Sequence, residues 1–158
     1  MENDYLNIMI QSLQKKVKIL DKIIEMNKEQ HQILSKEELD SEAFEQNVQE
    51  KSDLVEQINF LDEGFEDLYD RIKTVIKTEK QEHKEEILIL KQLITEITER
   101  SVNIQSEEVR NRKLVEMRFS QERKKVRNMK NSSTVANQYY KTMTKLNHID
   151  AQFMDRKK

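Results

Sequence analysis

Apolar residues recur at steps of three and four over three long stretches of this 158-residue chain, with charged residues between them. Such steps keep one stripe of an α-helix facing a partner. The clearest stretch runs from Asp40 to Ile76, and we take it as the element around which the others are organised. Its stripe consists of Phe44, Val48, Val55, Ile58, Leu61, Phe65, Leu68 or Tyr69, Ile72 and Val75 or Ile76. Asp40 or Ser41 is the predicted N-cap, because either side chain can accept a bond from a free backbone N–H. A single helix is too narrow to bury its own stripe, so the other stretches must cover it.

A first helix is predicted from about Asp4 to Leu34, with a short bend at residues 35–41 after it. Its stripe is apolar from Leu6 to Ile24 and polar beyond that point, at Asn27 and His31. We therefore expect the distal end of this helix to fray or to face solvent. The bend separates the first helix from the second, so we do not expect one unbroken rod.

Residues 77–84 contain no apolar side chain and interrupt the pattern. They form either a tight turn or a continuous polar helix, and we favour the turn because an antiparallel neighbour buries the stripe. A third helix follows. It is most apolar from Ile87 to Ile97, so its first half should contact both earlier helices. Apolar residues are sparser after Ile104, so its distal half should project beyond the bundle. The predicted fold class is all-α: an elongated antiparallel helical hairpin or bundle of about three long helices, with a short, mobile C-terminal helix.

The end of the chain has a different character. Residues 131–137 are rich in Ser, Thr and Asn, whose side chains compete for backbone hydrogen bonds and favour a helix break. We divide the single domain into a long-helix bundle, 1–130, and a flexible C-terminal amphipathic tail, 131–158. The tail stripe contains Tyr139, Met143, Leu146, Ile149 and Phe153. Met and aromatic side chains make an adaptable surface for a partner helix, but the same stripe can dock on its own bundle. Both interpretations stay open.

Composition narrows the class of protein. The chain is 37% charged and has no Pro. It also has no Cys, and this absence excludes a disulfide framework and fits a reducing cytosol. We see no signal peptide and no apolar run near the roughly 20 residues that membrane insertion needs. Residues 1–99 carry a net charge of −11 and residues 100–158 one of +9. We favour the interpretation that helices of opposite charge pack together. The lesser alternative is a nucleic-acid surface formed by Arg118, Arg123, Lys124, Lys125, Arg127 and Lys130.

Residues with catalytic or metal-binding chemistry do not form a recognisable motif. His31, His83 and His148 are isolated in the sequence, and none lies in a His-x-x-x-His or Glu-x-x-His pair of the kind that a helical metal site uses. There is no glycine-rich phosphate loop and no nucleophile elbow. We therefore predict a protein that is not an enzyme, with no catalytic, cofactor-binding or metal-binding residues and no cofactor.

Several runs of residues resemble the FlgN family of bacterial flagellar export chaperones. They are Glu29–Leu34, Leu39–Phe44 and Val48–Leu54, the third-helix residues Leu93, Ile97 and Val102–Ile104, and the end of the chain from Tyr139 to Lys158. Arg71 matches the Arg that ends the leucine-rich turns of the family's second helix. The thin, polar tract Ser101–Lys113 departs from the family pattern.

The resemblance implies a cytoplasmic flagellar type III export chaperone. Such a protein binds terminal helices of hook–filament junction proteins, prevents premature assembly and aids their delivery to the flagellar export apparatus. Self-association is left open. We assign client binding to the sparse, Met- and Tyr-rich stripe of the C-terminal third: Val126, Met129, Tyr139, Tyr140, Met143, Leu146, Ile149 and Phe153. The alternatives are a structural coiled-coil or scaffold protein and, with less support, a nucleic-acid-associated helical protein.

Overall fold

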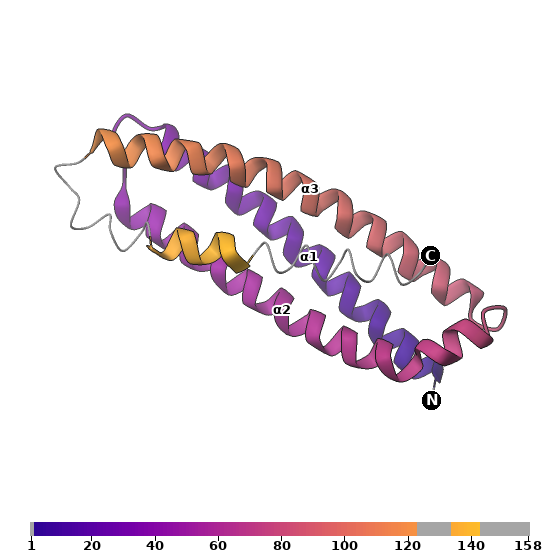
Figure 1. Cartoon of the computed structure of the whole chain (residues 1–158). Helices are drawn as coiled ribbons and strands as arrows, with labels where there is room; N and C mark the ends of the chain where they lie inside the picture. The colour runs from indigo at the N-terminus through magenta and orange to yellow at the C-terminus, as the bar shows by residue number, and fades with distance from the viewer. Residues whose placement is uncertain (1, 123–133, 143–158) are drawn as a thin grey trace.

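The computed structural model describes residues 2–122 and 134–142, with side chains from residue 4 onward. Three long helices, α1 (Glu2–Ser35), α2 (Ser41–Thr78) and α3 (Lys84–Gln121), lie side by side in an elongated bundle, and α2 runs antiparallel to the other two (Figure 1). A short helical segment, 134–142, lies along the bundle beside α2 (Figure 1). No strand occurs in the described ranges, which confirms the all-α fold class. Within the same ranges, no helix has an apolar stretch long enough to cross a membrane.

Local sequence signals set the helix boundaries. The helical structure is interrupted between the end of α1 at Ser35 and the start of α2 at Ser41. The backbone N–H of Ala43 donates to Asp40 Oδ1 at 3.1 Å, which confirms Asp40 as the N-cap of α2. At the other end, α2 stops at Thr78 and α3 starts at Lys84. The predicted turn is therefore confirmed over the continuous polar helix. Gly64 lies within α2 and faces open space, so no neighbouring helix packs against it closely enough to require a residue without a side chain.

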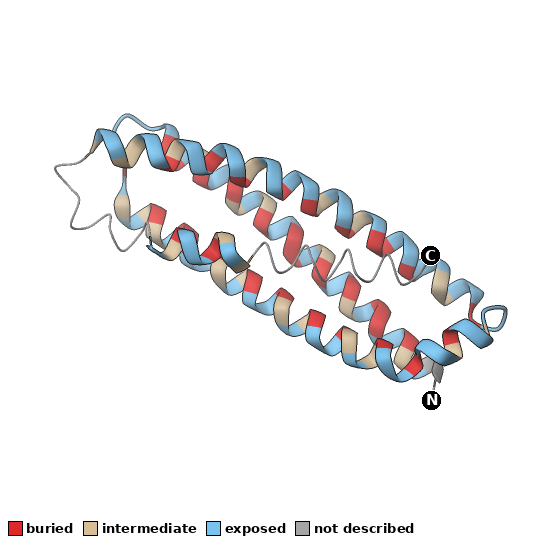
Figure 2. Ribbon diagram, in the orientation of Figure 1, coloured by how far each residue is buried: buried red, intermediate tan, exposed pale blue. Residues whose placement is uncertain are grey.

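The predicted stripe of α2 is buried except at Leu61, which is half-buried. Its fully or nearly buried members are Phe44, Val48, Val55, Ile58, Phe65, Tyr69, Ile72 and Ile76. Buried positions follow one side of each long helix, and exposed positions follow the other (Figure 2). The three- and four-residue spacing thus identified the buried face correctly.

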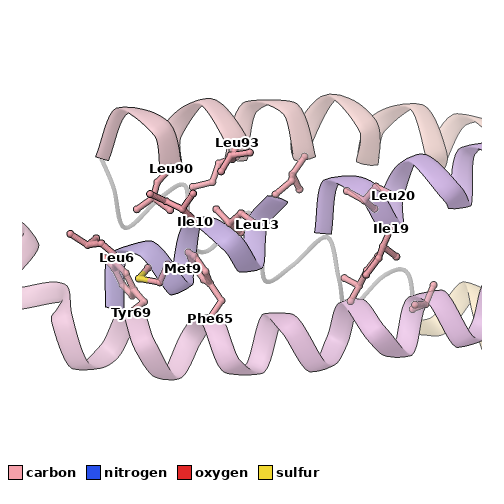
Figure 3. Packing of buried hydrophobic residues seen from close by; sticks show 14 of the residues in the cluster. Leu6, Met9, Ile10, Leu13, Ile19, Leu20, Phe65, Tyr69, Leu90 and Leu93 are labelled. Atoms are coloured by element: carbon pink, nitrogen blue, oxygen red, sulfur yellow. The ribbon is translucent and has the colours of Figure 1, made fainter. Parts of the chain in front are cut away.

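The helix at the centre of the bundle is α1, and not α2 as the sequence suggested. Helix α1 packs closely against both α2 and α3, whereas no comparably close packing joins α2 to α3 in the described bundle. Figure 3 shows why: side chains of α1 such as Met9 and Ile10 extend toward Phe65 of α2 on one side and Leu90 of α3 on the other. The longer stripe of α2 is more conspicuous in the sequence, but a helix with two apolar neighbours needs a wider buried face.

The expected fraying of α1 and the expected projection of α3 are both wrong. The distal end of α1 remains helical to Ser35, and Asn27 and Gln30 are buried in it. The distal half of α3 packs beside this end, with Asn111 and Val115 buried. A second hydrophobic cluster lies there, in which the rings of Phe44 and Phe119 meet edge to face at 5.7 Å. Among the buried polar side chains at this end, Gln30 and Asn111 bond to each other across the helices, whereas the Asn27 side chain has no hydrogen-bond partner among the described residues.

Candidate functional site

A layer of polar side chains crosses the bundle between its two hydrophobic clusters. Each long helix contributes two residues to this polar layer, one helical turn apart: Asn27 and Gln30 from α1, Asn47 and Lys51 from α2, and Glu108 and Asn111 from α3. Spacings of three and four place both members of each pair on one side of their helix. All six residues are buried, which is unusual for polar and charged side chains. Their contribution to stability therefore depends on the hydrogen bonds and ion pairs that they form in the interior.

Amide groups form the part of the layer around Gln30. The Gln30 Nε2 donates to Asn47 Oδ1 at 3.2 Å, and Asn47 Nδ2 donates to the Met26 carbonyl at 2.9 Å. From α3, Asn111 Nδ2 donates to Gln30 Oε1 at 3.2 Å and to the Asn27 carbonyl at 3.1 Å. Helix α1 is thereby bonded to both neighbours at one level. Buried amides of this kind fix the register of packed helices, because a one-turn slip leaves them unbonded.

An ion pair connects α2 to α3 in the same layer. The Lys51 ammonium lies 2.8 Å from Glu108 Oε1, and it also donates to Gln30 Oε1 at 3.5 Å. Only 1% of the Lys51 side chain and 7% of the Glu108 side chain are exposed. Burial lowers the pKa of Lys51 below its usual value, and the charge of Glu108 opposes that change. Removal of either partner would leave the other charge buried and uncompensated.

Segment 134–142 covers this ion pair. The Lys51 Nζ lies 4.3 Å from the centre of the Tyr139 ring, which is a cation–π contact. Beside it, Arg112 of α3 lies 5.2 Å from the centre of the Tyr140 ring, and the two tyrosine rings meet at 5.7 Å and 69°. Ala136 joins the second hydrophobic cluster. We call the side chains under the segment, Lys51, Glu108 and Arg112, the tail seat.

The surroundings of the two tyrosines hold their phenols in the neutral form. Burial raises the pKa of Tyr139 well above its ordinary 10.0, and the neighbouring charge of Glu108 raises it further. The pKa of Tyr140 rises for the same two reasons, although Arg112 opposes the rise. In the unfolded chain both phenols ionise first, so the stability that they contribute is lost as pH rises above about 10.

A tyrosine titration can test this docking. In a Tyr5→Phe/Tyr69→Phe variant, Tyr139 and Tyr140 are the remaining tyrosines of the four in the chain. We expect their phenolate absorbance to appear above the ordinary range and together with alkaline unfolding. A free peptide of residues 134–142 is the control, and should titrate near 10. Two phenols that titrate near 10 in the folded chain would show that the segment is not docked.

The structure describes two of the predicted client-binding residues. Tyr139 is buried and Tyr140 half-buried, both against the chain's own bundle. Val126, Met129, Met143, Leu146, Ile149 and Phe153 lie outside the described residues. So does most of the basic cluster considered for nucleic acid, except Arg118. That side chain donates to the Glu37 carbonyl at 3.1 Å and pairs with Glu122 at 3.2 Å.

Sequence reasoning missed the polar layer. Lys51 and Glu108 read as members of solvated faces, because charged residues are rarely buried unless paired. A usable signal was present in the stripe of the first helix, which continues through Asn27 at regular spacing. A second buried pair, Lys16 with Asp62 at 3.0 Å, was missed for the same reason and joins α1 to α2 farther along the bundle.

Hydrogen bonds and an ion pair across the bundle fix the register of the three long helices, and their surface binds one further short helix at the tail seat. The family model FlgN, described as "FlgN protein", matches residues 1–147, which includes all three long helices and segment 134–142. Among curated proteins and solved structures, none gives a significant match to the chain. The matched range is most of the chain, and it covers the polar layer as well as the tail seat. The chain therefore belongs to the FlgN family of flagellar export chaperones.

Proposed function

We propose that this chaperone acts in the cytoplasm on hook–filament junction proteins, and that it captures a terminal helix of the unassembled client at the tail seat. It keeps the client from assembling early and aids its delivery to the flagellar export apparatus. The observation that carries the proposal is the docked segment 134–142: the bundle presents a place for a short amphipathic helix, and the chain's own helix covers it.

The tail seat suits a helix that carries an aromatic residue. Tyr139 covers a buried ammonium and lies beside a buried carboxylate, so a helix in its place gains from an aromatic ring over Lys51. The apolar surface around Ala136 adds affinity at about 25 cal/mol per Å² buried, before ordering costs. The polar layer underneath favours one register of the bound helix, because other registers leave the ion pair under an apolar side chain.

Client capture starts when segment 134–142 leaves the tail seat. The client helix then packs against the bundle, and the stripe of Tyr139 and Tyr140 contacts the client from the other side. The client must displace contacts that the chain already makes, which weakens binding but limits the time that the Lys51–Glu108 pair is uncovered. Contact residues elsewhere on the predicted stripe, such as Met129 and Phe153, extend the surface. None has a catalytic role in this proposal.

Removal of the tail tests the proposal. Truncation after Lys130 vacates the tail seat but also removes the stripe that contacts the client. We expect the lost contacts to dominate and to weaken binding of an unassembled junction protein at least tenfold, or about 1.4 kcal/mol. Because Tyr139 covers Lys51, the truncated chain should also melt earlier, so binding is compared by calorimetry at a temperature where both forms are folded. Tyr139→Ala should weaken binding too. The matched control is Gln138→Ala, at an exposed position of the same segment. Equal affinity of the truncated and whole chains would refute capture by the tail.

A structural role through self-association is a second candidate, favoured by one observation. Leu88, Val102 and Val109 on α3 are more than half exposed, and they are 14 and 7 residues apart. Multiples of seven place apolar side chains on one seam of a coiled coil. A second copy of the chain would cover this seam, and Val102→Glu should then shift the sedimentation of a dimer to that of a monomer. If the wild type sediments as a monomer throughout, this candidate fails.

A further inference from the structure

The turn between α2 and α3 brings three potential metal ligands together. Glu79 follows the last residue of α2, and His83 precedes the first residue of α3. The Glu82 N–H donates to the Glu79 carbonyl at 3.2 Å, which folds the turn back on itself. As a result, one ligand atom from each of Glu79, Glu82 and His83 lies within 4.8 Å of the others.

His83 is in an unusual state for a polar residue at a turn. It is only 5% exposed, and neither ring nitrogen has a hydrogen-bond partner among the described residues. Its Nε2 lies 3.7 Å from Glu79 Oε2, which is next to the carboxylate but too far for a hydrogen bond. A buried polar group without a partner costs free energy, so it requires an explanation. An ion between the imidazole and the carboxylate would supply the missing partner.

The ligand chemistry selects a class of ion. Calcium and magnesium are held by oxygen atoms, whereas zinc and its neighbours among the transition metals accept an imidazole nitrogen together with carboxylates. Around tetrahedral zinc, bonds of about 2 Å place adjacent ligand atoms roughly 3.3 Å apart. The separation of 3.7 Å between Glu79 and His83 is already close to that value. Glu82 is exposed, so its carboxylate can rotate to complete the set, with water as the fourth ligand.

We infer that the α2–α3 turn binds one divalent transition-metal ion of the zinc class, through Glu79, Glu82 and His83. The ion joins the end of α2 to the start of α3 and restrains the turn. Lys80 in the turn and Lys84 at the start of α3 repel a cation, but both are exposed and water screens their charge. The turn lies at one end of the bundle, and segment 134–142 lies alongside α2 toward the other end (Figure 1).

Zinc titration of the untagged, chelator-treated full chain tests the inference. We expect calorimetry to show saturable binding of one Zn²⁺ per chain, and nitrogen-detected imidazole spectra to show that His83, among the three histidines, is the one that changes. Glu82→Gln should weaken binding at least tenfold, and His83→Gln should abolish saturable binding. The matched control, Glu85→Gln, alters an exposed carboxylate outside the ligand group and should leave affinity unchanged.

Circular dichroism of each variant establishes that the helices are intact. His83 is buried, so its replacement can disturb the turn, but Glu82 is exposed and its replacement keeps the test decisive. The inference is overturned if wild-type chain shows no saturable binding. It is equally overturned if Glu82→Gln and Glu85→Gln bind zinc alike, or if zinc changes the signals of His31 or His148 in place of those of His83.

Discussion

Replacement of Lys51 by alanine is expected to lower the free energy of unfolding by about 3–5 kcal/mol, because it leaves Glu108 charged in the interior without a partner. Lys51 and Glu108 are 2.8 Å apart and almost fully buried. The change also removes the cation under the Tyr139 ring and one hydrogen bond to Gln30. Denaturant unfolding followed by circular dichroism measures the loss. Glu108→Ala should cost a similar amount, since it leaves the Lys51 ammonium unpaired.

A double variant separates the ion pair from simple packing. Lys51→Met with Glu108→Leu removes both charges, and we expect it to be much closer in stability to wild type than either single alanine variant. The surface pair Lys28–Glu25 is the matched control: its atoms are 3.5 Å apart and both side chains are exposed, so Lys28→Ala should change stability by less than about 1 kcal/mol. If Lys51→Ala costs no more than Lys28→Ala, the polar layer is not buried as described.

Phe65→Ala is expected to cost about 3–5 kcal/mol, because it opens a cavity where α2 packs on the central helix α1. Phe65 belongs to the main hydrophobic cluster, and Figure 3 shows it directed toward Met9 of α1. The chain supplies a matched control five residues earlier on the same helix. Phe60 is 78% exposed, so Phe60→Ala should leave the melting temperature nearly unchanged. Two variants that melt alike would show that α2 packs through a different face.

The sequence was sufficient to predict the three long helices and most of the buried face of α2. The spacing from Phe44 to Ile76 identified the stripe of α2, and Asp40 marked its first turn. The packing of the helices against one another was harder to predict, because an apolar stripe shows that a helix has a partner but does not show which helix that partner is. Helix α1 has a neighbour on each of two sides, so its buried face is wider than one stripe. Lys16 and Ile23 are fully buried, whereas the adjacent Val17 and Ile24 are only half-buried.

The candidate sites were less predictable than the helices, for a different reason at each site. Lys51 and Glu108 are 57 positions apart, and no local pattern distinguishes either from a surface charge. Within the turn, Glu79 and His83 are four residues apart, a spacing that suggests one helix face, yet they lie on either side of a helix break. Only the fold of the turn brings Glu82 into the same group. Tertiary pairing therefore decides the role of Lys51 and Glu108, and the local fold of the turn decides that of Glu79, Glu82 and His83.

Hydrogen exchange of the chain with and without a junction-protein terminal helix tests the central claim most directly. Capture at the tail seat predicts a change in exchange in α2 around Lys51, in α3 around Glu108 and in segment 134–142. A competing surface exists on the other side of α2, where Lys15, Ile19 and the exposed Phe60 line an open pocket between α1 and α2. Protection confined to that pocket, with the exchange of residues 134–142 unchanged, would contradict the account.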